Sequence, residues 1–189
     1  MPSSDWTAFW DSKHSIYVNA KHYAAHYRRL AEAFRRYAPE NGVMLDYGSG
    51  EALSADKVAE KVERLILCES APNVRTMLAG RFGGNRKIVV RRPEDIAMMS
   101  PGSLDTIVMH SVAQYMSAEE LDSVLRRFRR LLKRGGLLVL GDVIPRRYPA
   151  LGDAIALLNF GSDEGFYWAA LRGLFRTYFS DYRQLRKSL

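Results

Sequence analysis

A glycine-containing turn and two acidic residues give this sequence its clearest chemical signal. The turn Gly48-Ser49-Gly50 follows a short apolar run, and Asp46 stands just before it. Glycine lets the backbone turn sharply and approach a bound molecule closely. Glu69 follows Gly48 by 21 residues, at the end of the next apolar run. At this spacing a carboxylate can accept hydrogen bonds from both hydroxyls of a ribose, so the pattern predicts a site for a nucleoside-containing ligand.

Two residues argue against a dinucleotide, and hence against an oxidoreductase. Leu53 occupies the place of the third glycine of the dinucleotide fingerprint, and Asp46 would repel a pyrophosphate. Asp46 suits a cation instead, and S-adenosylmethionine carries both a sulfonium and an ammonium group. We therefore expect S-adenosylmethionine, or S-adenosylhomocysteine as its bound product. The structural alternative is that Asp46 caps a turn and Glu69 is a surface acid.

The elements that must position these residues alternate between apolar strands and helices. Strands are expected at 43–47, 65–69, 87–91, 105–110 and 137–143, and helices at 19–37, 53–63 and 72–82. Another helix begins at the capping box Ser117–Glu120 and is expected to end with Lys133, Arg134 and a left-handed cap at Gly135. This alternation predicts an α/β fold with a Rossmann-like, doubly wound parallel sheet that binds ligands at the carboxyl ends of its strands.

Five segments between Val43 and Val143 resemble, in order, the motifs of class I S-adenosylmethionine-dependent methyltransferases: LDYGSGEA, LILCES, RRPEDI, LDTIVMHSVAQYM and LLKRGGLLVLGDV. The resemblance implies strand order 3-2-1-4-5 and methyl transfer from S-adenosylmethionine. It implies cofactor contacts from Asp46, Gly48, Ser49, Gly50, Glu69, Ser70, Glu94, Asp95, His110 and Tyr17. The sequence departs from the family at Ala52, where a third glycine often stands, and at Arg92-Pro93, where an aspartate and a small residue often contact adenine.

Methyl transfer is an in-line displacement that needs alignment of the nucleophile and sometimes a general base. His110 ends the expected fourth strand and is the first candidate for that base; the alternative is that it only orients the cofactor or packs. Tyr115 and His14 are the other catalytic candidates, with ordinary packing as their alternative. No metal is expected: His22 and His26 are four residues apart, but nothing completes a site. Cys68 is expected to be buried and inert.

The sequence predicts one domain over 1–189, with N-terminal lid helices at 1–40, a cofactor-binding core at 43–144 and a helical tail at 145–189. Tail helices are expected at 153–160 and 165–178. The sixth and seventh strands of the family have no counterpart in the sequence. The fifth strand would then have a bare edge, so we expect either a fragment of a longer protein or an edge covered by the tail or by a partner.

The composition of the chain limits the partners and the cellular setting that we expect for it. The chain has 189 residues, a formal net charge of +7 and one cysteine, so no internal disulfide forms and a cytoplasmic setting is expected. No apolar stretch approaches the length of a membrane span. The paired arginines fit solvated helix faces, so a small-molecule acceptor is favoured over RNA. RNA methylation and a non-catalytic binding module stay open, and the sequence determines neither the acceptor atom nor the oligomeric state.

Overall fold

The computed structural model describes residues 8, 11, 17–143 and 150–178. The chain divides into two compact units, one of Met1–His14 and Arg28–Val143 and the other of Ser15–Tyr27 and Ile144–Leu189. The boundary after Val143 falls next to the predicted end of the core at 144, and the single domain over 1–189 stays a prediction. Helix α2 (Ala20–Tyr37) contributes residues to both units.

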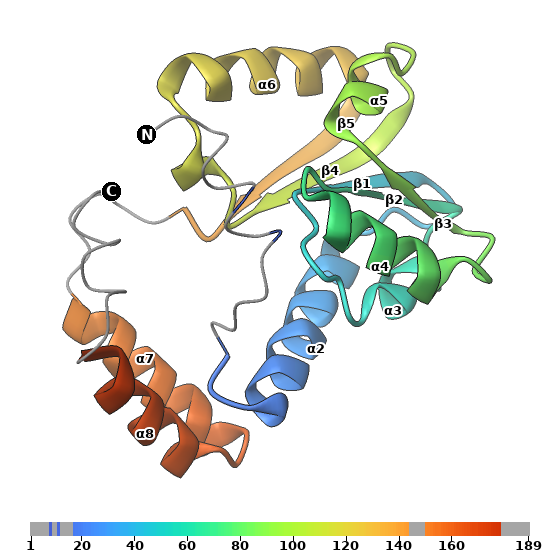
Figure 1. The fold of residues 1–189 in the computed structure, drawn as a ribbon. Coiled ribbons are helices and arrows are strands. Elements are labelled where there is room, and N and C mark those ends of the chain that lie inside the picture. The colour runs from blue at the N-terminus through green and yellow to red at the C-terminus, as the bar shows by residue number, and fades with distance from the viewer. Residues whose placement is uncertain (1–7, 9–10, 12–16, 144–149, 179–189) are drawn as a thin grey trace. The chain divides into compact units, whose positions relative to one another are not determined.

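The first unit is built around a five-stranded sheet in which every pair of neighbouring strands is parallel (Figure 1). Its strands are β1 (Val43–Tyr47), β2 (Arg64–Cys68), β3 (Ile88–Arg91), β4 (Leu104–His110) and β5 (Leu132–Gly141). They are arranged in the order β3-β2-β1-β4-β5, which confirms the predicted Rossmann-like order. Asp46 is in register with Leu67 of β2 and Val108 of β4, so the ends of β1, β2 and β4 meet at one edge.

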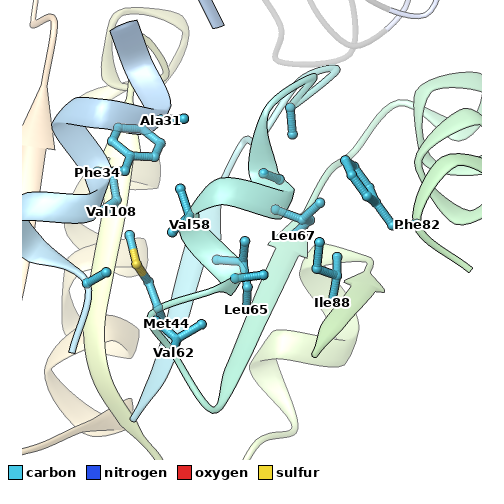
Figure 2. Close-up of a cluster of buried hydrophobic side chains, with 14 of the residues drawn as sticks. Ala31, Phe34, Met44, Val58, Val62, Leu65, Leu67, Phe82, Ile88 and Val108 are labelled. Atoms are coloured by element: carbon cyan, nitrogen blue, oxygen red, sulfur yellow. The ribbon is translucent and has the colours of Figure 1, made fainter. Parts of the chain in front are cut away.

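Alternating side chains on the strands supply two separate cores, because successive residues point to opposite faces. Met44 and Val108 pack on one face with Phe34 of α2, and Figure 2 shows this cluster. Leu45 packs on the other face with Phe128. The first face is covered by the part of α2 from Arg28 onward, by α3 (Ala55–Ala59) and by α4 (Pro72–Phe82), and the second by α5 (Pro93–Ala97) and α6 (Ala118–Leu131).

Helix α6 begins as predicted and ends earlier than predicted. The Ser117 hydroxyl accepts from the Glu120 amide at 3.2 Å, and the Glu120 carboxylate accepts from the Ser117 amide at 2.8 Å, which confirms the capping box. The helix nevertheless ends at Leu131. Gly135 has a φ of +80°, but it lies inside the β5 segment, so its predicted role as the helix cap is wrong. Pairing of Leu132 with Leu104 in the sheet takes precedence over local helix propensity.

The second unit contains the tail helices α7 (Ala150–Asp163) and α8 (Tyr167–Tyr178), so two tail helices are confirmed and the first is longer than predicted. Phe166 and Ala170 pack there against Ala25 of α2. The His22 ring stacks on Phe166 at 4.9 Å, so His22 belongs to this small core. Within 17–143 and 150–178, no sixth or seventh strand forms, and no helix combines the length and apolarity needed to cross a membrane.

Candidate functional site

The glycine turn at the carboxyl end of β1 is fixed by its own backbone. Gly48 and Gly50 have φ values of +78° and +54°, a region that side chains disfavour. The amides of Gly48 and Ser49 both donate to the Cys68 carbonyl, at 2.8 and 3.0 Å, which fastens the turn to the end of β2. A Cβ added at Gly48 would lie 2.3 Å from a methyl carbon of Val112. Glycine at 48 therefore allows both the turn and the close approach of the loop after β4.

Glu69 connects this turn to the start of α4. It is buried, and its Oε2 accepts from the Gly50 amide at 2.9 Å. Its Oε1 accepts from the Ala71 amide at 2.9 Å and from the Ser70 hydroxyl at 3.3 Å. A carboxylate has about four acceptor positions, so Glu69 retains capacity for hydroxyl donors of a ligand. Ser70 itself is exposed.

Asp46 is a buried acid next to a second acid. Burial, reinforced by the charge of Glu69, raises the pKa of Asp46 to about 7. Among the described residues, none donates a hydrogen bond to the Asp46 carboxylate. A buried carboxylate without a partner is costly unless it is protonated or meets a positive charge. The neighbouring Ser49 hydroxyl is also buried and has no hydrogen-bond partner in the described part of the chain. The Asp46 carboxylate and the Ser49 hydroxyl, together with Glu69, fit a cationic ligand with hydroxyl groups, such as S-adenosylmethionine.

His110 ends β4 on the same edge of the sheet. Because Asp46 is in register with Val108, His110 and Gly48 each lie two residues further along. The half-buried His110 ring packs edge-on against Phe34 with 5.8 Å between ring centroids. Burial lowers the pKa of His110, and the Asp142 carboxylate opposes that effect. His110 is thus mainly neutral near pH 7, as a general base must be.

The loop after β4 contains Gln114, which, like Tyr115, resembles a position from which the methyltransferase family often faces its substrate. Gln114 donates from Nε2 to the Ser111 carbonyl at 2.9 Å, whereas its Oε1 is buried without a partner in the described residues. Gln114 precedes Tyr115 in the short 3-10 helix η1 (Ala113–Tyr115), and Tyr115 is half-buried. The sequence signal for Gln114 was its position in the fourth motif. Its role, like that of Tyr115, stays a prediction.

The acids after β3 are placed differently from each other. RRPEDI forms the short helix α5, which the sequence reading missed. Asp95 accepts from the Arg92 amide and pairs with the Arg92 guanidinium, both at 3.0 Å, and that contact lowers the pKa of Asp95. Asp95 is therefore engaged at the start of α5, and its contact with the cofactor stays a prediction. Glu94 is exposed on the same helix, and its contact also stays a prediction.

The two N-terminal contacts that the sequence predicts, from His14 and Tyr17, stay predictions. His14 lies outside the described residues. Tyr17 belongs to the second unit, where its ring lies 5.2 Å from His22 and 5.0 Å from Tyr23. Asp11 belongs to the first unit, and its carboxylate accepts from the Asn73 amide at 2.6 Å.

The structure gives no support to a metal site or a reactive thiol. The described residues contain no group of three or more metal-ligating side chains, and His22 accepts from the Val18 amide at 3.3 Å. Cys68 is buried in β2, and burial raises the pKa of its thiol far above the ordinary value. Cys68 is thus an inert core residue, as predicted.

Comparison with known proteins identifies the family. The profile of a family described as "Methyltransferase domain" matches residues 45–140, half of the chain. Chondramide synthase of Chondromyces crocatus is 34% identical over 97 residues, which make up 42% of this chain and 2% of that protein. The tRNA 5-carboxymethoxyuridine methyltransferase of Escherichia coli is 28% identical over 116 residues, 59% of this chain and 44% of that enzyme. The chain thus spans less than half the length of either relative.

Solved structures agree at the level of the fold. Phosphoethanolamine N-methyltransferase 1 of Haemonchus contortus, solved with phosphoethanolamine and S-adenosylhomocysteine, superposes with a TM-score of 0.61. The two proteins are 17% identical, and the match covers 78% of this chain and 34% of that one. The profile match, the strand order and the glycine turn with its two acids lead to one conclusion: this chain belongs to the class I family of S-adenosylmethionine-dependent methyltransferases.

Proposed function

We propose that this chain binds S-adenosylmethionine at the carboxyl ends of β1 and β2 and transfers its methyl group to a small-molecule acceptor. The observation that carries the proposal is the buried Asp46 carboxylate, which has no hydrogen-bond donor among the described residues and lies beside Glu69. A ligand with positive charge and ribose hydroxyls satisfies both acids. S-adenosylmethionine supplies a sulfonium-activated methyl group, whose transfer leaves a neutral thioether.

Each polar residue at the carboxyl ends of the strands has a distinct role in this proposal. Glu69 accepts the ribose hydroxyls, while its bonds to Gly50 and Ala71 keep the carboxylate oriented. Asp46 provides the negative charge that favours the cationic form of the cofactor over its neutral product. His110 accepts the proton that the acceptor loses. The Gln114 Oε1, which has no hydrogen-bond partner among the described residues, provides an acceptor for the substrate.

The distribution of charge favours a small acceptor over a polynucleotide. The carboxyl edge of the sheet holds the acids Asp46, Glu69 and Asp142. Arg130 of α6 lies toward the opposite edge, where its carbonyl accepts from Gly102 and its side chain donates to the carbonyl of Ala97. Arg127 is the α6 arginine whose charge acts on Tyr47 at the carboxyl end of β1. A polyphosphate backbone needs positive charge close to the reacting base or ribose. Similarity to chondramide synthase and to a phosphoethanolamine methyltransferase agrees with this choice.

RNA is the second candidate, because one relative methylates tRNA and the net charge is +7. One experiment separates the two. The purified chain is incubated with methyl-labelled S-adenosylmethionine and, in parallel, with a deproteinised small-molecule extract or with total tRNA. Label in the small-molecule fraction supports the proposal, and label in tRNA replaces it with the second candidate. Tight binding of S-adenosylmethionine without transfer to any acceptor contradicts catalysis and supports a binding module.

A further inference from the structure

Two residues with strained backbone stand where β4 and β5 end. Ser111 and Asp142 have φ values of +57° and +51°, a region that residues with side chains rarely adopt. They follow His110 and Gly141, which are paired in the sheet, and the Ser111 amide donates to the Gly141 carbonyl at 3.0 Å. Residues held in this region cluster at functional sites. The strain brings the Ser111 hydroxyl between the His110 ring and the Asp142 carboxylate.

The hydrogen atoms shared by His110, Ser111 and Asp142 can be assigned from the number of donors and acceptors that each side chain has. The Ser111 hydroxyl donates its single hydrogen to the Asp142 carboxylate. The Ser111 oxygen lies 2.9 Å from Nδ1 of His110, and it has no second hydrogen to donate there. The bond between them therefore requires a hydrogen on Nδ1. A neutral imidazole carries one hydrogen, so Nε2 holds the lone pair.

The rest of the His110 environment leaves Nε2 available. The ring packs against Phe34 and close to Gly141, where an added Cβ would lie 2.6 Å from Cδ2 of His110. Neither neighbour carries a polar side chain, and within the described part of the chain no hydrogen bond reaches Nε2. Asp142 is the charged group whose field acts on His110. The half-buried ring thus offers one free nitrogen, and that nitrogen is an acceptor.

We propose that Ser111 and Asp142 are positioning residues that hold His110 with its hydrogen on Nδ1 and present Nε2 as the proton acceptor for methyl transfer. The proposal rests on the proposed function. In the reaction, the nucleophile of the acceptor forms a bond to the methyl carbon, and the carbon–sulfur pair passes to sulfur. The proton of the nucleophile moves to Nε2, and Asp142 stabilises the imidazolium through Ser111. The acceptor is then a hydroxyl or amine that carries a proton on the atom to be methylated.

The test reads the tautomer directly, by long-range ¹H–¹⁵N correlation spectra of histidine-labelled protein. The chain has 4 histidines, and the spectrum of His110→Gln assigns the signal. Ser111→Gly is the matched variant, because glycine accepts the positive φ and removes the hydroxymethyl side chain. We expect a protonated Nδ1 in the wild type and a shift toward protonated Nε2 in Ser111→Gly. A wild-type ring protonated on Nε2, or an unchanged signal in Ser111→Gly, overturns the proposal.

A kinetic measurement then separates positioning from a merely structural role. Asp142→Asn also suits a positive φ and keeps an acceptor oxygen, so it preserves the tautomer and removes the charge. We expect kcat to fall about 10- to 100-fold in Ser111→Gly, with the KM for S-adenosylmethionine unchanged within about twofold. In Asp142→Asn, we expect the acid limb of the pH–rate profile to move to lower pH. Unchanged kcat in Ser111→Gly overturns the proposal. The tautomer is read without cofactor or acceptor, so failure to bind S-adenosylmethionine would reject the proposed function alone.

Discussion

Asp11 caps helix α4 from 62 residues away along the chain, through a contact with Asn73. Its carboxylate accepts from the Asn73 amide at 2.6 Å and from the Asn73 side-chain nitrogen at 3.0 Å. The residue at the N-cap position of α4 is Ala71, which has no side-chain acceptor. Since Ala71 also donates to Glu69, the cap stabilises the loop that carries the proposed ribose acid.

Removing this cap is expected to lower stability. Asp11→Ala leaves the Asn73 amide in the first turn of α4 without this acceptor, and loss of an N-cap costs about 0.5–2 kcal/mol in the free energy of unfolding. Urea titration measures this loss, and hydrogen exchange at the Asn73 amide is expected to accelerate. Glu40→Ala is the control, because Glu40 is an exposed acid outside this contact. Equal stability of the wild type and Asp11→Ala would contradict the capping role.

Asp46 is expected to make the fold less stable as the pH rises. Its pKa is about 7 in the folded chain, against about 3.9 in the unfolded chain. The folded chain therefore keeps a proton that the unfolded chain releases, and this contribution to stability is lost as the pH rises from about 4 to 7. Asp46→Asn should raise the free energy of unfolding by roughly 2–4 kcal/mol at pH 8 and change it little at pH 4. Denaturant titrations at both values check the sign.

The same residue should link S-adenosylmethionine binding to pH. A bound cation favours ionised Asp46, so binding releases a proton below pH 7, and affinity rises by up to about tenfold per pH unit. Calorimetry in buffers of different ionisation enthalpy detects that proton. Asp46→Asn should abolish the release. Equal proton release from the variant and the wild type would assign it to another group.

Glu69→Ala is expected to weaken cofactor binding by about 1.5–3 kcal/mol, or roughly 10- to 150-fold in Kd, because charge-assisted hydrogen bonds to the ribose are lost. The matched control is Glu63→Ala, an exposed acid next to the opposite end of β2. Calorimetric titration with S-adenosylhomocysteine measures both variants. Unchanged affinity in Glu69→Ala would remove Glu69 from the site.

Gly48→Ala is expected to destabilise the turn on two grounds, its φ of +78° and the 2.3 Å approach of Val112 to the added carbon. We expect a loss of about 2–4 kcal/mol in the free energy of unfolding, together with loss of cofactor binding. Gly84→Ala is the control, since an added carbon there meets nothing within 4 Å and its φ is not positive. Equal thermal stability of the two variants would contradict this account.

His110→Ala is expected to lower kcat by about 100-fold or more and to change cofactor affinity little. Burial lowers the pKa of His110, so activity should rise with pH through a value below 6.5 and then level off. The variant should lose this limb of the pH–rate profile. Persistence of the same limb in His110→Ala would assign it to another group and remove His110 from the role of base.

Features that depend on neighbours along the chain could be predicted from the amino-acid sequence. The capping box of Ser117 and Glu120 and the turn at Gly48 arise from side chains and backbone within a few residues of one another. The alternation of apolar strands with helices allowed a parallel sheet, and the motif order gave its strand order. Spacing along the chain also placed Glu69 at the end of β2, beside that turn, because parallel neighbouring strands end at the same edge.

Contacts between residues that are distant in sequence became known from the fold alone. Asp11 with Asn73 and Ser111 with Asp142 are separated by 62 and 31 residues, and no local pattern specifies which of many polar residues will meet. Pairing with Leu104 of β4 also places Leu132 in β5, although the local sequence favours continuation of the helix α6. The pKa of about 7 for Asp46 arises from burial of its carboxylate and from the nearby charge of Glu69, and both depend on tertiary packing. Spacing along the chain thus identified the candidate site residues. Burial and contacts between distant residues set the protonation and orientation of these side chains, because desolvation and hydrogen-bond geometry depend on the whole surroundings of a group.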